Sequence, residues 1–201
     1  MPRSIGILAF GSLLDNPGKE IEAALVGRKA NVVTPFSVEF ARRSMKRGGA
    51  PTLVPVKSGG RPVHAQILLL EVAEQEAKDR LWRREINRVG GGGHYVHRAN
   101  PGPNTLIIDR YENFEGLSVV LAARFAATIA PLTAEHLADL AIASLASAES
   151  GRDGITYLID AKRNGIVTPL SAAYEKEILR RMETADLNKA SLKLRAECFI
   201  L

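Results

Sequence analysis

The N-terminal apolar run constrains the fold of this chain more than any other feature. Residues Ile5–Phe10 are apolar without interruption, and the run stops at Gly11-Ser12. Such a run, ended by a glycine, is typical of a buried strand followed by a tight turn. An amphipathic segment, Lys19–Val26, comes next, and we predict a helix there. The pattern therefore predicts a first strand that delivers a loop of small residues to one end of a sheet, where backbone N–H groups can bind an anion or a carbonyl oxygen.

Alternating or continuous apolar patterns predict further strands in the first two-thirds of the chain. These strands are Phe36–Ala41, Pro51–Val56, Val63–Leu70, Thr105–Asp109 and Val119–Ala126. Because the turn-forming residues Lys57–Pro62 separate the second from the third, residues 52–70 are expected to form a hairpin.

Helical periodicity dominates the last third of the chain. The predicted helices are Ala73–Arg84, Ala134–Ala148 with Thr133 as its cap, Gly154–Asn164, and Ala172–Thr184 with Ser171 as its cap. No repeat, low-complexity segment or linker interrupts the chain. We therefore expect one α+β domain over residues 1–201 with a helical C-terminal third.

Composition narrows the class of protein. Of the 201 residues, 46% are hydrophobic and 24% charged, which is ordinary for a globular protein. Cys198 is the only cysteine, so neither a disulfide framework nor a cysteine-based metal site is expected. The N-terminus does not have the pattern of a signal peptide and no apolar stretch is long enough to span a membrane, so we expect a cytoplasmic protein.

The net charge of +5 raises the question of a nucleic-acid partner. Basic residues cluster at Arg42–Arg47 and Arg80–Arg88, but acidic residues are interleaved elsewhere, and aromatic residues for base stacking make up only 5%. The distribution argues against nucleic acid and favours a field that attracts small anionic substrates. No feature of the sequence favours a particular oligomeric state.

Three short motifs resemble catalytic or binding sites but lack a necessary part. Gly90–Gly93 is followed by no Gly-Lys-Ser/Thr, which favours a mobile loop over a phosphate-binding one. His94 and His97 have no third metal ligand nearby, so no metal is expected. Ser12 does not stand in a Gly-x-Ser-x-Gly motif, which argues against a serine nucleophile.

Glu85 is the carboxylate of greatest interest. It lies at the end of the helix predicted over Ala73–Arg84, nine residues before His94-Tyr95. By itself, a glutamate after two arginines is most often a solvated surface charge. It becomes a candidate for chemistry when it is considered together with the Gly11-Ser12 turn.

Several motifs along the chain resemble, in order and spacing, those of the γ-glutamyl cyclotransferase-like family, over about residues 5–180. They are Phe10-Gly11-Ser12-Leu13-Leu14, Phe40, Thr52-Leu53-Val54-Pro55, Val63-His64-Ala65, Leu81-Trp82-Arg83-Arg84-Glu85, Gly93-His94-Tyr95, Tyr157-Leu158, Ala161-Lys162-Arg163-Asn164-Gly165-Ile166 and Tyr174. Three positions depart from the family pattern. Phe10 stands where the family has Tyr, Trp82 where it has Asp, and Ala65 where it has Gly.

The resemblance implies a mixed, partly barrel-like sheet surrounded by helices, and a substrate that is a γ-glutamyl amide or peptide. The α-amine of the substrate would attack its own γ-carbonyl and release 5-oxoproline and a free amine or amino acid. Glu85 would be the general acid/base, a role that requires its partial burial. Substrate would be bound by the loop Phe10, Gly11, Ser12 and Leu13.

Two tyrosines are further substrate-binding candidates from the same resemblance. Tyr95 would donate a hydrogen bond in the pocket. Tyr157 is a weaker candidate, for which packing with a satisfied hydroxyl is an equal alternative. No cofactor and no metal is implied.

Two other functions remain open from the sequence. One is an enzyme of the same fold that acts on another amide, and the other is a non-catalytic binding or regulatory protein, because fold alone does not decide function. Both enzyme hypotheses require Glu85 to lie within about one small-substrate length of the Gly11–Leu13 loop.

Overall fold

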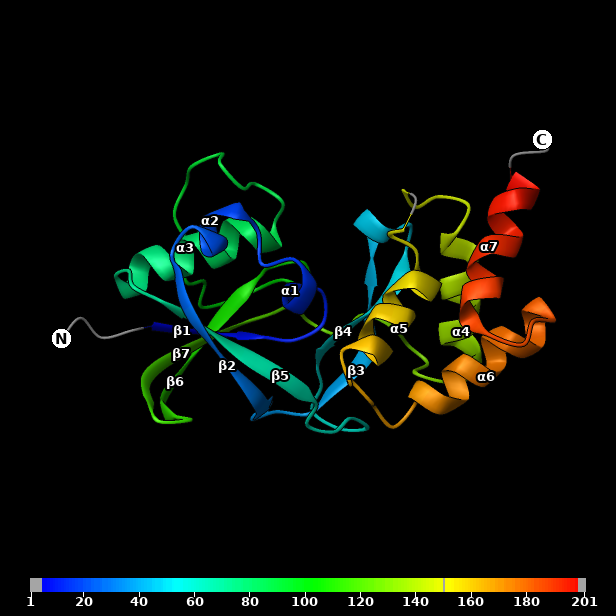
Figure 1. The fold of residues 1–201 in the computed structure, drawn as a ribbon, viewed down its shortest axis with the longest axis horizontal. Helices are drawn as coiled ribbons and strands as arrows, with labels where there is room; N and C mark the ends of the chain where they lie inside the picture. The colour runs from blue at the N-terminus through cyan, green and yellow to red at the C-terminus, as the bar shows by residue number, and fades with distance from the viewer. Residues whose placement is uncertain (1–4, 150, 199–201) are drawn as a thin grey trace. The chain divides into compact units, whose positions relative to one another are not determined.

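The computed structural model describes residues 5–149 and 151–198, and the side chains up to residue 192. Its backbone contacts divide the chain into two compact units, each built from two separate stretches. Unit 1 consists of Met1–Pro35 and Val63–Ala126, and unit 2 of Phe36–Pro62 and Ala127–Leu201. Both units combine strands with helices, which confirms the α+β class (Figure 1). The division into two compact units does not decide whether residues 1–201 form a single domain, which stays a prediction.

Unit 1 is built on a five-stranded mixed sheet. Its strands are β1 (Ile5–Ala9), β2 (Leu25–Val33), β5 (His64–Leu70), β6 (Ile107–Phe114) and β7 (Leu117–Arg124). They lie in the order β2-β5-β1-β7-β6, and β1 is antiparallel to β5 and parallel to β7. The sheet is mixed, as predicted, but the described strands form no closed barrel, because β2 and β6 each pair on one side only.

The central strand β1 is buried along its whole length, which confirms the interpretation of the N-terminal apolar run. Gly6 allows its neighbours to approach closely. A Cβ at this position would lie 2.7 Å from the side chain of Ile67 on β5 and 2.9 Å from that of Val120 on β7. Any larger residue at position 6 would push β5 and β7 away from β1.

Three helices accompany the sheet of unit 1: α1 (Ser12–Asp15), α2 (Lys19–Glu22) and α3 (Glu74–Glu85). The longest, α3, agrees with the predicted helix and covers one face of the sheet (Figure 1). Its Ala77 and Leu81 are fully buried in one cluster with Ile7 and Leu121. Packing against this core therefore sets the position of the last turn of α3, which carries Glu85.

Two predictions about the strands were wrong. The helix predicted over Lys19–Val26 ends at Glu22, and β2 begins at Leu25, because pairing with β5 outweighs the short helical pattern. Residues 52–70 do not form a hairpin. Pairing with other strands places β5 in the sheet of unit 1 and β4 (Ala50–Pro55) in unit 2.

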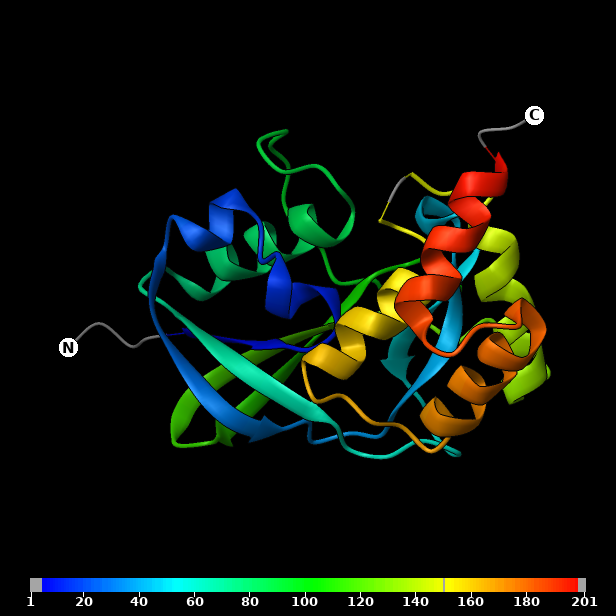
Figure 2. The same ribbon diagram turned by 45° about the vertical axis from the view of Figure 1, so that its right-hand side comes forward.

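Unit 2 consists of a two-stranded sheet and helices. β3 (Val38–Ser44) pairs with β4, and a 3-10 turn at Met45–Arg47 joins them. The helices are α4 (Ala134–Ser144), α5 (Gly154–Arg163), α6 (Ser171–Met182) and α7 (Leu187–Cys198). α4 packs beside α6, and α5 beside α7 (Figure 2). The helical C-terminal third is thus confirmed.

The two predicted helix caps of unit 2 differ in outcome. Thr133 caps α4 through a hydrogen bond that its side chain accepts from the His136 amide at 3.3 Å, as predicted. Ser171 is instead the first residue of α6, and Leu170 is the N-cap. Among the helices that the structure describes, none is long and apolar enough to cross a membrane.

Candidate functional site

The loop Phe10–Leu13, called the glycine–serine loop below, leaves β1 and enters α1. Gly11 has φ 57° and ψ −137°, a conformation that glycine adopts without strain. The amides of Ser12 and Leu13 stand in the first turn of α1, where a helix has no carbonyl of its own to receive them. The Leu13 side chain is buried in the core and holds the loop in place, whereas Phe10 is half-buried. The loop therefore follows a buried strand, and the binding role of its backbone N–H groups stays a prediction.

Glu85 lies at the C-terminal end of α3, with 19% of its side chain exposed. Its Oε1 accepts a hydrogen bond from Nη1 of Arg84 at 2.6 Å. The other carboxylate oxygen, Oε2, accepts no hydrogen bond from any group in the described part of the chain. A half-buried carboxylate with one oxygen held and one oxygen open has the form that a proton acceptor needs.

The guanidinium of Arg84 connects this carboxylate to the glycine–serine loop. Its Nη2 donates to the Ser12 carbonyl at 2.8 Å and lies 3.3 Å from the Ser12 hydroxyl. Because one rigid guanidinium makes both contacts, Ser12 O and Glu85 Oε1 are less than about 8 Å apart. The structure thus brings together the two halves that the sequence predicts, within one compact unit.

Arg84 also donates to the Asn16 carbonyl, from Nε at 3.0 Å and from Nη2 at 2.6 Å. Its side chain is 13% exposed. No motif in the sequence gives Arg84 a role of its own. The only available signal was its position directly before Glu85, which did not reveal a contact with residues 72 positions earlier in the chain.

Tyr95 belongs to the hydrophobic core of unit 1 and is 7% exposed. Its hydroxyl oxygen accepts from the Ile108 amide at 3.0 Å and lies 3.4 Å from Nδ1 of His97. Its own amide donates to Asp79 Oδ1 at 2.8 Å. These contacts fix the ring of Tyr95, and its role as a substrate donor stays a prediction.

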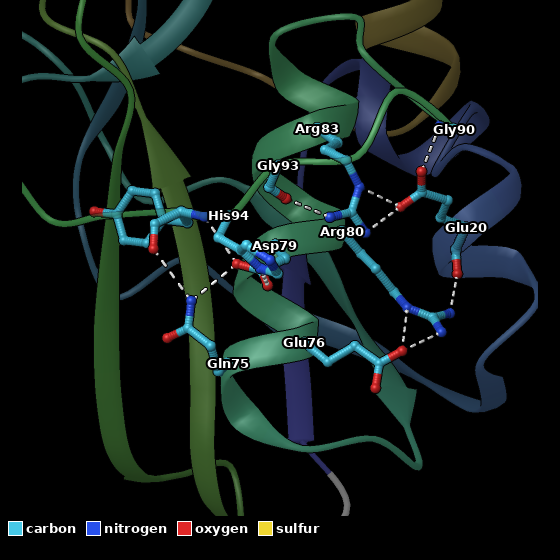
Figure 3. A network of polar contacts seen from close by, with 10 residues as sticks. Glu20, Gln75, Glu76, Asp79, Arg80, Arg83, Gly90, Gly93 and His94 are labelled. Atoms are coloured by element: carbon cyan, nitrogen blue, oxygen red, sulfur yellow. Dashed lines mark hydrogen bonds and ion pairs between the residues drawn. The ribbon is translucent and has the colours of Figure 1, made fainter.

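The segment Gly90–Gly93 is held at both ends against α2 and α3 (Figure 3). Nη1 of Arg83 donates to the Gly93 carbonyl at 2.8 Å, and the Gly90 amide donates to the Glu20 carboxylate. Arg83 Nε also donates to Glu20 Oε2 at 2.7 Å. This hydrogen bond, against the opposing effect of burial and with help from the Gly90 amide, lowers the pKa of Glu20. The loop predicted from four glycines therefore has anchored ends.

A buried carboxylate, Asp79, holds the next residues of the same connection (Figure 3). Its Oδ2 lies 2.7 Å from Nδ1 of His94, and its Oδ1 accepts from the Tyr95 amide and from Gln75 Nε2 at 2.9 Å. Burial is the largest single influence on the pKa of Asp79 and raises it, but the hydrogen bonds from His94, Tyr95 and Gln75 together outweigh burial and lower the pKa. The sequence gives no signal for the role of this carboxylate, since its pattern is that of any helical Asp.

A metal centre would need several ligands in one place. The residues that the structure describes contain no group of three or more His, Cys, Asp or Glu side chains that could hold a metal ion.

Tyr157, the remaining predicted site residue, lies on α5 in unit 2. It is 6% exposed, and its hydroxyl accepts from the Leu53 amide at 3.4 Å. The Arg47 guanidinium lies 4.7 Å from its ring centre, and the Phe40 ring packs edge-on at 6.2 Å. These contacts describe a packed tyrosine within unit 2, and a substrate-binding role stays a prediction.

Comparison with known proteins gives no assignment: no protein-family model matches the chain, and a search of characterised proteins finds no significant match.

Proposed function

We propose that this protein is a γ-glutamyl cyclotransferase-like enzyme that converts a γ-glutamyl amide into 5-oxoproline and a free amine or amino acid. The observation that carries the proposal is the bridge made by Arg84 between Ser12 and Glu85. It joins a set of backbone donors and a half-buried carboxylate at a distance that one small substrate can span. The reaction itself is inferred from the family that the sequence motifs resemble.

In the proposed reaction the nucleophile is the α-amine of the substrate itself. It attacks the γ-carbonyl carbon, a C–N bond forms, and the bond between that carbon and the leaving nitrogen breaks. Glu85 takes one proton from the attacking amine and gives one to the leaving nitrogen, so no further reactant is needed. Because the nucleophile is already tethered, the protein has only to fold the substrate and to move this proton.

The glycine–serine loop supports the same reaction from the other side. Backbone N–H groups of Gly11, Ser12 and Leu13 would bind the α-carboxylate or the oxyanion that develops on the γ-carbonyl oxygen. Phe10 would supply an apolar wall without a hydroxyl. Tyr95 is the further substrate-binding candidate within unit 1.

A product screen tests the proposal. The purified protein is incubated with glutathione, γ-glutamyl dipeptides and γ-glutamylamines, and 5-oxoproline is quantified by mass spectrometry. We expect 5-oxoproline from at least one substrate and none from the same compound with an acetylated α-amine, which has no nucleophile. Glutamate in place of 5-oxoproline would show that water, and not the α-amine, attacks the γ-glutamyl bond, and absence of turnover would favour a binding protein.

Glu85→Gln tests the assignment of the base. We expect E85Q to lower kcat by about 10²–10⁴-fold, the usual contribution of positioned proton transfer. Glu76→Gln is the matched control, since Glu76 lies on the same helix and pairs with Arg80 on its exposed side. E76Q should keep its rate within about twofold. An E85Q protein as fast as the parent would exclude Glu85 as the base.

A further inference from the structure

Arg84 has an unusual set of hydrogen bonds for a helical arginine. A guanidinium has five N–H groups, and four of those of Arg84 already have acceptors. Nε and Nη2 donate to the Asn16 carbonyl, Nη2 donates to the Ser12 carbonyl, and Nη1 donates to Glu85 Oε1. Arginine usually binds a carboxylate ligand through two parallel N–H groups. The one remaining N–H does not provide that pair, so the arrangement is unsuited to binding a substrate carboxylate.

The carbonyls that Arg84 holds lie at the two ends of α1. Ser12 is the first residue of α1, and Asn16 is its C-cap. A four-residue helix is far too short to be stable alone, and α1 has no side-chain cap at its N-terminus. The conformation of α1, and with it that of the glycine–serine loop, therefore depends on contacts from outside, and Arg84 provides one at each end.

Gly18 makes room for the side chain of Arg84. Its φ is +84°, and a Cβ at this position would lie only 3.1 Å from Arg84 Cγ. Any other residue at position 18 would be strained and would press on the arginine stem. This is a second observation, independent of the hydrogen bonds, that the local backbone is shaped around Arg84.

We propose that Arg84 is a positioning residue, which holds the Glu85 carboxylate and the glycine–serine loop in a fixed relation and does not itself bind substrate. The inference rests on the proposed function of the site. Without Arg84, Glu85 Oε1 and the carbonyls of Ser12 and Asn16 all lose a donor, and the two halves of the site are no longer tied. A misplacement of about 1 Å between reacting groups can cost about 10²-fold in rate.

Arg80 offers a matched control on the same helix. It donates to the Glu76 carboxylate and to the Glu20 carbonyl. None of its described contacts involves Glu85 or the glycine–serine loop. Arg80→Met therefore removes the same guanidinium and keeps the same apolar stem as Arg84→Met without touching the proposed site.

A double-mutant cycle of R84M and E85Q, read by 5-oxoproline release, is the kinetic test. We expect R84M to lower kcat about 10–100-fold, and R80M to lower it less than about threefold. In the E85Q background the effect of R84M should be clearly smaller than in the parent, because the arginine then positions only the loop and no base. Equal factors in both backgrounds would indicate a merely structural role and overturn the proposal.

Hydrogen exchange gives a test that does not depend on turnover. The amides of Leu14 and Asn16 donate to carbonyls of the loop and of α1 and so report whether this turn is held. We expect R84M to speed their exchange by at least about tenfold, and R80M to change it less than about twofold. Unchanged exchange in R84M would overturn the proposal.

The two tests separate the two proposals. A parent protein that releases no 5-oxoproline from any substrate overturns the proposed function, and the exchange rates then still decide whether Arg84 holds the loop. If R84M does not fold, Arg84→Lys takes its place, since a lysine keeps the charge but cannot reach three acceptors with fixed geometry. R84K should give changes in the same direction as R84M.

Discussion

Two glutamates, one in each unit, have opposite surroundings. Glu85 in unit 1 is 19% exposed, and its one described partner is a charged group, Arg84. Glu39 on β3 of unit 2 is fully buried, and both of its oxygens are engaged by neutral donors. Its Oε1 accepts from the Phe40 amide at 2.8 Å and the Thr168 hydroxyl at 2.5 Å, and its Oε2 from the Leu170 amide at 3.1 Å.

The difference shows why one carboxyl group stabilises the fold and the other can take part in a reaction. Glu39 accepts a hydrogen bond at the N-cap of α6, where the helix dipole favours negative charge, and it ties the connection before α6 to β3. Three hydrogen bonds engage both oxygens of Glu39, so this group holds its neighbours in place and has no open oxygen for a substrate. Glu85 has one engaged oxygen, which orients it, and one open oxygen, which can take a proton.

Glu39→Gln gives the largest expected effect on stability. Both oxygens of Glu39 accept hydrogen bonds, from backbone N–H groups and a hydroxyl. In glutamine an NH2 group replaces one of these oxygens and cannot accept, so at least one buried hydrogen bond is lost. We expect the free energy of unfolding to fall by about 1–3 kcal/mol. Urea denaturation followed by circular dichroism measures the change.

Glu85→Gln is the matched comparison for stability. Because Glu85 is partly exposed and its ion pair reaches solvent, E85Q should cost less than about 1 kcal/mol while abolishing most of the proposed activity. An E39Q protein as stable as the parent, or an E85Q protein as destabilised as E39Q, would break the contrast between the two glutamates.

Two tyrosines in unit 2, Tyr174 and Tyr157, should have smaller effects on the free energy of unfolding, and the two effects should have opposite signs. Tyr174 on α6 is completely buried against Phe40, its ring centre 5.4 Å away, and its hydroxyl has no hydrogen-bond partner in the described part of the chain. Burial, with lesser effects of Asp153 and Tyr157, raises the pKa of Tyr174. The hydroxyl of Tyr157 does accept a hydrogen bond, from the Leu53 amide.

We therefore expect Tyr174→Phe to raise the free energy of unfolding by about 1 kcal/mol and Tyr157→Phe to lower it by about 1 kcal/mol. Urea denaturation of the two variants in parallel measures both changes. A loss of stability in Y174F would show that its hydroxyl has a partner in solution, and an unchanged Y157F would show that the 3.4 Å contact contributes nothing.

The parts of unit 1 that could be predicted from the sequence depend on signals within single elements. The apolar run predicts β1, and the helical period predicts α3, each to within one residue at either end. Glycine at position 11 predicts the turn, because its conformation is local. Glu85 has no such local signal, and only the resemblance of several motifs to one family identified it as the other half of a candidate site.

What could not be predicted is the contact between distant segments. The bond between Arg84 and Ser12 joins residues 72 positions apart, and the contact of His94 with Asp79 depends on how a connection folds back on α3. β2 was missed for a related reason. Its exposed and buried residues alternate only weakly, and its place at the sheet edge comes from pairing with β5.

The anchored connection Gly90–Tyr95 gives the smallest and most local prediction. It is held by two carboxylates, those of Glu20 and Asp79, whose pKa values are both lowered in the folded protein. A group with a lowered pKa stabilises the fold above its ordinary pKa, about 4 for these residues, and that stabilisation is lost as the pH falls through the lowered value. The hold on this connection should therefore weaken in acid, below about pH 4.

Glu20→Gln isolates one of the two anchors. At pH 7 it should speed exchange of the Gly90 amide by less than about fivefold, in keeping with an ion pair of less than about 1 kcal/mol. The difference between E20Q and the parent should shrink as the pH falls through the lowered pKa of Glu20, because a protonated Glu20 is as neutral as glutamine. Glu22→Gln, on the exposed side of the same short helix, should leave exchange unchanged at every pH. A difference that does not shrink in acid would show that Glu20 anchors the connection by its shape and not by its charge.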